Sequence, residues 1–353
     1  MGPAERLAIL ISGFYGFGNV GDEAVLAATV QSLRARLGSV PLVVLSADPA
    51  ATAAAYGVEA VSRTSLPAIL AALRRSRLFL SGGGSLIQDA TSARSALYYL
   101  GLLRLAQIRR VRTMVYAAGL GPLRRPLIRR LAGSVLGRTD VVAVRDRDSA
   151  ALLPAIGVRR PPVLAADPAA LLRPGNAPPS GGPVIGVVIR PWGDDAYVTP
   201  LAAALVQVAT RRSAPILVVP FHRALDLAVS RQLAEASGGR LIDRDLAPAD
   251  ALALIGGVQV VVGMRMHALL FAAMAGVPPV GLAYDPKVTA LFGDLEVGDP
   301  LPLGADTTTM ATAIEQAWEH REALRPTLLA ASARLRTRAE VAVEEAVRLY
   351  SAV

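Results

Sequence analysis

Short apolar runs alternate with longer amphipathic segments along the whole chain. The short runs predict strands at residues 7–12, 42–45, 78–80, 113–118, 141–144, 184–189, 216–219, near Leu241, 258–262 and 280–283. The longer segments predict helices at 20–37, 65–75, 93–109, 125–136, from 145 onward, 199–211, 223–236, 248–255, 266–275 and 308–350, the last interrupted only by Pro326. Strands that alternate with helices of this length are typical of parallel sheets built from βα units.

One stretch breaks this alternation. Residues 173–183 are rich in Pro and Gly and lack an apolar period, which is the composition of a linker. We therefore expect a Rossmann-like domain at 1–173, a linker at 174–183 and a second Rossmann-like domain at 184–353, whose last helix packs back across the first. Parallel sheets bind ligands at the carboxyl ends of their strands, so the site is expected there, in a cleft that both domains face.

Composition narrows the class of protein. The chain has 353 residues, of which 53% are hydrophobic and 18% are charged, values that favour large cores over disorder. It has no Cys, which excludes thiolate chemistry and fits a reducing compartment. The pattern shows neither a leader peptide nor a long uncharged span, so a soluble, cytoplasmic protein is expected.

The charge is strongly basic. With 37 basic and 28 acidic residues, the net charge is 37 − 28 = +9. Arg-rich stretches at 109–112 and 124–130 could contact an anionic membrane face, or they could be ordinary solvated helix faces. Only 5% of residues are aromatic and none interleave with these arginines, so nucleic-acid binding is not expected. The only Lys in the chain is Lys287, and its compact ammonium has a geometry that a guanidinium cannot copy.

The clearest candidate for chemistry follows the apolar run at 258–262. Arg265 and His267 stand where this strand turns into a helix, near the positive end of the helix dipole, where cations are disfavoured. An anionic ligand would offset that cost, because backbone N–H groups, guanidinium and imidazole would converge on it. Lys287 follows the next strand and should lie at the same edge of the sheet.

Two further residues stand at predicted strand ends in the second domain. Arg190 follows that domain's first strand and precedes Pro191-Trp192, so it is a candidate clamp for a carboxylate or a phosphate, with a surface arginine as the alternative. His222 follows the strand at 216–219 and could contact a ligand, although a structural histidine is the commoner case.

The loop at residues 13–23 has the pattern G-x-G-x-x-G between a strand and a helix, as a dinucleotide site requires. Asp22 and Glu23 argue against that function, because they would repel a pyrophosphate at the helix start by several kcal/mol. They could instead accept hydrogen bonds from sugar hydroxyls. Favourable pairing with the helix dipole is the alternative, and it suits Glu23 better than Asp22.

A second glycine loop, Ser-Gly-Gly-Gly-Ser at 81–85, follows the strand at 78–80. Gly83 at its centre would let a ligand approach the backbone, and Gln88 and Asp89 could bind hydroxyl groups. A tight turn is the alternative. No His, Asp and Glu cluster has the spacing of metal ligands, so no metal is expected.

These motifs together resemble the polysaccharide pyruvyl transferase family, and most closely its CsaB type, which places a pyruvate ketal on secondary cell-wall polysaccharide for S-layer anchoring. The resemblance rests on residues 13–24, 81–89, 190–192, 265–267 and 284–287. It implies a two-domain fold similar to GT-B glycosyltransferases and phosphoenolpyruvate as the donor, with no cofactor. It also implies a lipid-linked acceptor that contains N-acetylmannosamine, pyruvylated across its 4- and 6-hydroxyls, and with it peripheral contact with the inner membrane face.

The residue types suit this chemistry. Phosphoenolpyruvate carries a carboxylate and a phosphate, so its site needs several cations, and a histidine can exchange the protons that ketal formation requires. The resulting hypothesis assigns catalysis to His267, donor binding to Arg190, Arg265 and Lys287, and acceptor binding to Asp22, Gly83, Gln88, Asp89 and His222. The alternatives are a GT-B glycosyltransferase that uses a nucleotide sugar, a non-catalytic sugar- or nucleotide-binding protein, and a dinucleotide-dependent oxidoreductase.

Overall fold

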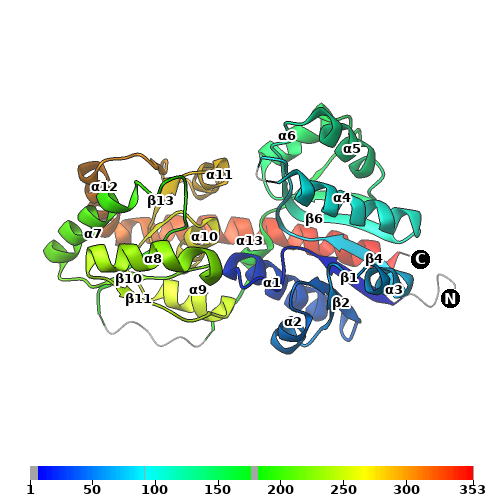
Figure 1. The fold of residues 1–353 in the computed structure, drawn as a ribbon, viewed down its shortest axis with the longest axis horizontal. Helices are drawn as coiled ribbons and strands as arrows, with labels where there is room; N and C mark the ends of the chain where they lie inside the picture. Colours follow the sequence, from blue (N-terminus) through cyan, green and yellow to red (C-terminus); the bar gives the residue numbers. More distant parts are fainter. Residues whose placement is uncertain (1–6, 91, 176–181, 353) are drawn as a thin grey trace. The chain divides into compact units, whose positions relative to one another are not determined.

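The computed structural model describes residues 7–90, 92–175 and 182–352, which form two compact units (Figure 1). The first unit comprises Met1–Phe17, Asp22–Leu172 and Arg336–Val353, and the second comprises Gly18–Gly21 and Arg173–Leu335. Most of the linker predicted at 174–183 lies outside the described residues. Gly175, at its start, belongs to the second unit, where its N–H donates to the Ala249 carbonyl over 2.8 Å.

The sheet of the first unit is parallel throughout, with the order β3-β2-β1-β4-β6-β7-β8 and β5 paired to β6. Its strands are β1 (Ala8–Ser12), β2 (Leu42–Ser46), β3 (Glu59–Ser62), β4 (Ser76–Ser81), β5 (Gly84–Ile87), β6 (Arg112–Leu120), β7 (Val141–Val144) and β8 (Val163–Leu164). The helices between them are α1 (Val20–Leu37), α2 (Pro49–Tyr56), α3 (Leu66–Arg75), α4 (Ala93–Ile108), α5 (Pro126–Leu136), α6 (Arg147–Ala155) and the 3-10 helix η2 (Pro168–Leu171).

The sheet of the second unit is also parallel, with the order β11-β10-β9-β12-β13-β14. Its strands are β9 (Ile185–Val188), β10 (Ile216–Val218), β11 (Arg240–Leu241), β12 (Val260–Gly263), β13 (Pro279–Ala283) and β14 (Leu301–Pro302). Its helices are α7 (Val198–Arg212), α8 (Arg223–Ser237), α9 (Pro248–Gly256), α10 (Met266–Ala275), α11 (Pro286–Leu295), α12 (Thr307–Glu319) and the first part of α13 (Arg321–Ser351).

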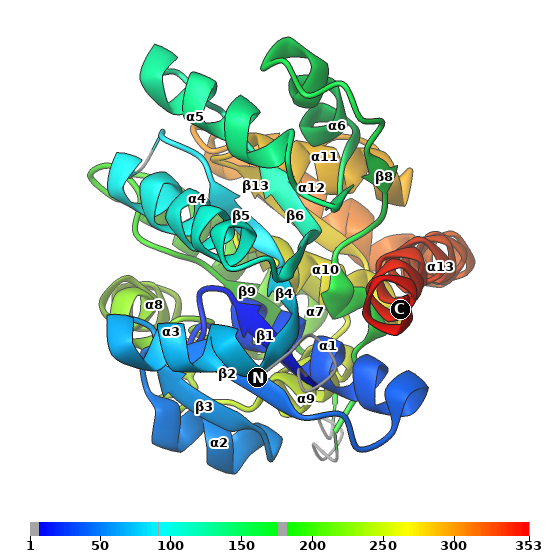
Figure 2. The same ribbon diagram turned by 90° about the vertical axis from the view of Figure 1, so that its right-hand side faces the viewer.

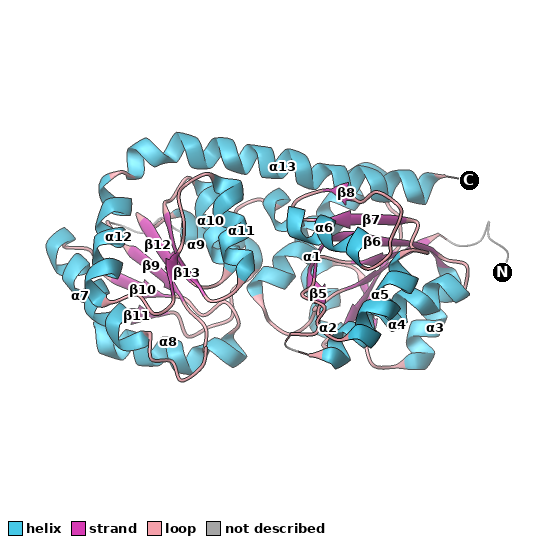
Figure 3. Cartoon of the chain, turned by 90° about the horizontal axis from the view of Figure 1, so that it is seen from above, coloured by secondary structure: helices cyan, strands magenta, loops and turns pink. Residues whose placement is uncertain are grey.

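Each unit buries its own hydrophobic core. Every residue of β1, β2, β9 and β12 is buried, as expected for strands that carry helices on both faces (Figure 3). One core includes Leu10, Phe79 and Val115, and the other includes Val187 and Val262. The prediction of two parallel α/β sheets is therefore confirmed.

Local signals explain where many helices begin. The N-cap residues Asp48, Ser65, Ser92, Asp146 and Asp306 each accept a hydrogen bond from the backbone N–H three residues later. The prediction of one helix at 308–350, interrupted only by Pro326, is wrong about where the break lies. The segment breaks at His320 into α12 and α13, and Pro326 lies inside α13.

Both sheets share one topological feature. The chain builds β1, β2 and β3 outward in one direction and then returns to place β4 on the other side of β1. In the second sheet it likewise builds β9, β10 and β11 before returning to place β12 beside β9. Doubly wound sheets bind ligands outside the carboxyl ends of the two strands at such a switch point. The switch points are β1/β4 in the first unit and β9/β12 in the second.

Candidate functional site

Four basic residues of the second unit that the sequence singles out lie at the carboxyl ends of the switch-point strands and their neighbours. β10, β9, β12 and β13 are consecutive parallel strands, so their carboxyl ends share one edge of the sheet. His222, Arg190, Arg265 and Lys287 follow these four strands in that order. The prediction that Lys287 lies at the same edge as Arg265 is confirmed by the β12–β13 pairing.

Arg190 and Lys287 both contact the aromatic ring of Tyr284. The Arg190 guanidinium carbon lies 5.0 Å from the centroid of Tyr284, and the Lys287 ammonium nitrogen lies 5.3 Å from it. Arg190 Nη1 also donates to the Tyr284 hydroxyl over 3.3 Å, while Trp192 packs edge-on against Tyr284 at 5.0 Å. Cation–π contacts of this kind hold a charge in place without neutralising it. Among the described residues Arg190 forms no ion pair, and Lys287 has only a long one, 3.8 Å to Asp285.

Arg265 is placed differently, because it pairs with a buried carboxylate. Asp226 in the first turn of α8 has a side chain with 0% exposure, and that of Arg265 is 12% exposed. The pair is bidentate: Nε donates to Oδ2 over 3.0 Å, and Nη2 donates to Oδ1. Asp226 therefore balances much of the Arg265 charge and fixes the plane of its guanidinium, while Nη1 and one Nη2 hydrogen point elsewhere.

Tyr197 lies near both arginines. Its hydroxyl donates to the Arg190 carbonyl over 2.6 Å. Burial raises the pKa of this phenol above its ordinary value, the carboxylates of Asp195 and Asp226 raise it further, and Arg190 and Arg265 oppose them. The phenol therefore stays a neutral donor, and it senses the charge of both guanidinium groups.

His267 occupies the first turn of α10, two residues after the N-cap residue Arg265. Its imidazole lies against the start of α1: a Cβ atom on Gly21 would lie 2.1 Å from His267 Nδ1, which is closer than atoms can approach. Gly21 belongs to the same unit as His267. The third glycine of the G-x-G-x-x-G pattern is thus required by the histidine that faces it, whereas Gly16 and Gly18 have φ angles of 79° and 70° that favour glycine.

His222 is also held in this unit. It is 6% exposed and forms an antiparallel bridge with Asn19, and the neighbouring Val20 N–H donates to the Phe221 carbonyl over 2.8 Å. The His222 backbone N–H donates to Asp226 Oδ2 over 2.9 Å. The structure therefore brings His222 together with Arg265, through Asp226.

Those other four residues lie in the first unit, around the switch point β1/β4. The two glycine loops meet there, since the Gly82 N–H donates to the Ser12 carbonyl over 2.6 Å. Tyr15, which is 1% exposed, fills the space beside them: a Cβ on Gly82 would lie 2.5 Å from its hydroxyl, and one on Gly13 would lie 2.2 Å from its ring. A Cβ on Gly83 would lie 2.8 Å from Val25. Close packing inside the unit therefore accounts for these glycines.

The acidic pair after the first loop divides in two. Glu23 is engaged internally, because its carboxylate accepts from the Gly16 N–H over 2.7 Å and from the Tyr56 hydroxyl over 2.8 Å. Burial, and then the charge of Glu23, raise the pKa of Tyr56. Asp22 instead lies at the second loop, where a Cβ on Gly84 would be 3.1 Å from its Oδ1. Asp22 is thus the member of the pair that joins the two loops.

Asp89 is 6% exposed, and its two carboxylate oxygens accept from the backbone N–H groups of Arg124 and Arg125, each over 2.7 Å. Desolvation by itself would raise the pKa of this carboxyl, but the two hydrogen bonds and the arginine charges bring it below its ordinary value. These bonds give Asp89 a structural part, and its contact with an acceptor stays a prediction, as does that of Gln88.

Two residues of this architecture are not indicated as site residues by the sequence pattern. Asp226 lies within an amphipathic helix, where an acidic residue in the first turn is unremarkable in sequence. Arg145 follows β7 and is 7% exposed, paired with Asp167 over 3.0 Å while Nη2 donates to the Ser85 hydroxyl over 2.8 Å. Arg145 thereby fixes the second glycine loop. The sequence feature that could have indicated Arg145 is its position directly after a strand, in the run Arg-Asp-Arg-Asp.

The described residues contain no group of three or more His, Cys, Asp or Glu side chains that could hold a metal ion. The second unit thus presents cations and an imidazole at its switch point, an arrangement that can bind an anion and exchange a proton with it. The first unit presents a carboxylate and backbone groups, which can bind hydroxyls.

Comparisons with known proteins agree with this architecture. A family model described as polysaccharide pyruvyl transferase matches residues 19–286. A comparison with curated proteins gives no match.

Three solved structures illustrate the likeness in fold. The S. aureus MnaA–UDP co-structure has a TM-score of 0.66 and 12% identity over 94% of this chain and 95% of that one. The UDP-GlcNAc 2-epimerase from Neisseria meningitidis bound to UDP-GlcNAc has a TM-score of 0.65 and 11% identity over 96% of this chain and 99% of that one. Anabaena Alr3699/HepE in complex with UDP-glucose has a TM-score of 0.62 and 12% identity over 99% of this chain and 100% of that one. These similarities show a GT-B-like fold.

Proposed function

The chain belongs to the polysaccharide pyruvyl transferase family, and from this premise we propose that it transfers the pyruvyl group of phosphoenolpyruvate to a saccharide, releasing phosphate. The acceptor that we propose is the one used by enzymes of the CsaB type. It is a lipid-linked cell-wall polysaccharide precursor whose N-acetylmannosamine receives a 4,6-ketal at the cytoplasmic face of the membrane. No cofactor is needed, because the enol phosphate is itself an activated donor.

One observation carries the proposal: Arg190, Arg265 and Lys287 stand at the ends of adjacent strands around the switch point of the second unit, and His267 stands beside Arg265. Phosphoenolpyruvate holds two anionic groups on three carbons. Arg190 and Lys287, both over Tyr284, suit one of them. The free edge of Arg265 and the first N–H groups of α10 suit the other.

The chemistry needs an acid that later acts as a base. We assign the proton that adds to the methylene carbon of the enol to His267, which makes C2 electrophilic. A sugar hydroxyl then forms a C–O bond to C2 and returns its proton to the imidazole. The second hydroxyl forms the other C–O bond as the C2–O bond to phosphate breaks, and its proton leaves with the phosphate. Gly21 presses against the imidazole and so fixes its orientation.

For the acceptor, we assign hydroxyl recognition to Asp22, supported by its place where the two glycine loops meet. Gly83, Gln88, Asp89 and His222 complete the assignment. Asp89 and Gly83 are engaged within their own unit, so these two act chiefly by shaping the loops, whereas His222 lies beside Asp226 in the second unit.

A second candidate is a GT-B glycosyltransferase that uses a nucleotide sugar. The observation that favours it is the fold, because several similar structures contain UDP or a UDP-sugar. The same cations could hold a diphosphate.

One experiment separates the two. The purified chain is incubated with a panel of lipid-linked disaccharides and either phosphoenolpyruvate or a UDP-sugar, and the products are followed by phosphate release and mass spectrometry. We expect phosphate and a pyruvyl ketal on the disaccharide that ends in N-acetylmannosamine. Transfer of a sugar from the UDP-sugar, with no reaction of phosphoenolpyruvate on any acceptor, would overturn the proposal.

A further inference from the structure

The positive charge of the chain is concentrated in one segment of the first unit. Residues 90–139 contain ten Arg and no Asp or Glu, which gives +10, so the other 303 residues carry 9 − 10 = −1. This segment spans α4, β6 and α5. A charge gathered so unevenly points to an anionic partner at this place.

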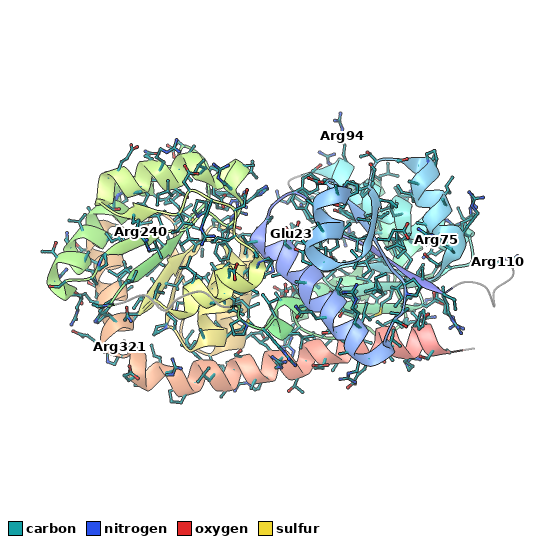
Figure 4. All side chains as sticks on the ribbon, turned by 90° about the horizontal axis from the view of Figure 1, so that it is seen from below. Glu23, Arg75, Arg94, Arg110, Arg240 and Arg321 are labelled. Atoms are coloured by element: carbon teal, nitrogen blue, oxygen red, sulfur yellow. The ribbon has the colours of Figure 1, made fainter. Side chains whose placement is uncertain are left out.

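Helix α4 exposes a single stripe of residues at helical spacing. Arg94, Leu97, Gly101, Arg104 and Ile108 are separated by three or four positions and are all exposed, which places them on one face. Leu97 is 44% exposed and Ile108 is 60% exposed. Arg94 extends away from the ribbon (Figure 4). This stripe is therefore apolar and basic at once.

Helix α5 continues the same surface. It packs beside α4 on one side of the sheet (Figure 2), and Gln107 Nε2 donates to the Val135 carbonyl over 2.9 Å. Leu127 is 64% exposed and Leu131 is 38% exposed, with exposed Arg130 between them. The opposite faces of both helices are buried in the core of the unit, so the two exposed faces point outward together.

We infer that this α4–α5 surface docks on a bilayer that contains anionic lipids. Arginines at its rim meet the headgroup charge, and the four aliphatic side chains enter the interface. Arg94, Arg104 and Arg130 form no ion pair with any described residue, so their charge is available to such a partner. No helix in the described part of the chain is long and apolar enough to cross a membrane, so the contact is peripheral.

The side chains on this surface favour lipid over nucleic acid. Single strands bind through aromatic platforms, and the exposed apolar residues of α4 and α5 are aliphatic. Tyr98 of α4 lies instead against Arg63, whose guanidinium carbon is 4.8 Å from its ring centroid. Leucine and isoleucine have little to offer a base or a phosphate, but they partition into an acyl boundary. The inference rests on this surface alone and needs no particular reaction.

Flotation of the full chain with vesicles tests it. Binding to phosphatidylcholine mixed with phosphatidylglycerol should exceed binding to phosphatidylcholine alone and should fall with added salt. Arg104→Glu with Arg130→Glu should weaken binding about tenfold or more, since each arginine near the surface contributes about fivefold. The matched control is Arg240→Glu with Arg336→Glu, which makes the same change in net charge at two exposed arginines outside α4 and α5; Figure 4 labels Arg240. Equal losses in both double variants would overturn the docking site.

The apolar half is tested by Ile108→Ser with Leu127→Ser, against Leu66→Ser with Leu225→Ser, which are exposed to a similar degree on α3 and α8. The first pair should lower vesicle affinity about threefold or more and the second should not. Thermal unfolding checks that all variants fold. An unchanged affinity in the α4–α5 pair, together with tight binding of a DNA oligonucleotide, would make the surface a polyanion site and overturn the inference. Because no step uses substrate, this outcome leaves the pyruvyl-transfer assay unaffected.

Discussion

The two units solve the same architectural problem with opposite chemistry. Both have a doubly wound parallel sheet, and both place distinctive residues at the strands where the winding reverses. At β1/β4 the residues are glycines and carboxylates, and their neighbours inside the unit already occupy them. Tyr15 fills the space beside Gly82, and the Glu23 carboxylate accepts from the Gly16 N–H. At β9/β12 and the adjoining strand β13 they are cations, and Arg190 and Lys287 are held by a ring face.

This difference teaches how a site keeps its charge available. A carboxylate that accepts two backbone N–H bonds, like Asp89, is satisfied and has little left for a ligand. A guanidinium over an aromatic face is positioned but still needs an anion. Arg265 is intermediate, since Asp226 holds one edge of its guanidinium and leaves the other. The second unit should therefore govern donor binding, and the first should govern loop structure and acceptor binding.

The strongest way to sharpen this comparison is His267→Ala. It should lower kcat about 10²- to 10⁴-fold, because the proton donor to the enol is lost, while phosphoenolpyruvate still binds. Phosphate release at saturating substrate measures kcat, and calorimetry measures the affinity for phosphoenolpyruvate. His320→Ala is the matched control, an imidazole at the end of α12 that bonds to the Gln316 carbonyl. Near-normal turnover in the His267 variant would remove the histidine from the mechanism.

The next largest effect should follow from Asp226→Asn. Removing one partner of a buried ion pair costs about 3–5 kcal/mol, measured as a loss in the free energy of unfolding in urea. The loosened Arg265 should also raise KM for phosphoenolpyruvate about tenfold, with a smaller change in kcat.

A purely structural Asp226 would lower stability and leave KM unchanged in the fraction that stays folded. The double variant Asp226→Asn with Arg265→Gln provides the control, because two amides can bond to each other. It should regain stability relative to Asp226→Asn while donor affinity stays low. Recovery of both would show that Arg265 does not bind the donor.

The sequence pattern predicted much of this arrangement for a physical reason. Buried parallel strands are continuous apolar runs, and their order along the chain constrains which ends share an edge, so Arg265, His267 and Lys287 could be placed together in advance. The strand β3 was missed because it is a half-exposed edge strand without an apolar run. The strand β5 was missed because it begins in the glycine run and forms only by pairing with β6.

Contacts between distant residues could not be predicted. Nothing local to Asp226 or Arg145 shows that each would bind a residue on another element, 39 positions away in one case and 22 in the other. The reason for Gly21 was hidden in the same way. The G-x-G-x-x-G pattern is that of a dinucleotide site, a function that Asp22 and Glu23 argue against, but nothing in it indicates the imidazole that the structure places against Gly21.

Gly21→Ala tests that last contact. Its φ angle suits any residue, so the penalty should come from the clash with His267 alone, about 1–3 kcal/mol in unfolding free energy. In the His267→Ala background the imidazole is gone, and the same substitution should cost much less. A double-mutant cycle on urea unfolding measures this coupling. Equal penalties in both backgrounds would mean that Gly21 is required for another reason.

Asp89→Asn in the first unit should have the smallest effect on the donor, because it should change stability alone. Because the folded pKa of Asp89 is lowered, its carboxylate stabilises the fold above its unfolded pKa of about 4 and loses that contribution as the pH falls through the folded value. The variant should thus be about 1–3 kcal/mol less stable than the parent at neutral pH, and the gap should close below about pH 4. Asp299→Asn, at an exposed carboxylate, should show neither effect. KM for phosphoenolpyruvate should stay unchanged in both, and a rise in the Asp89 variant would break the division of labour between the two sheets.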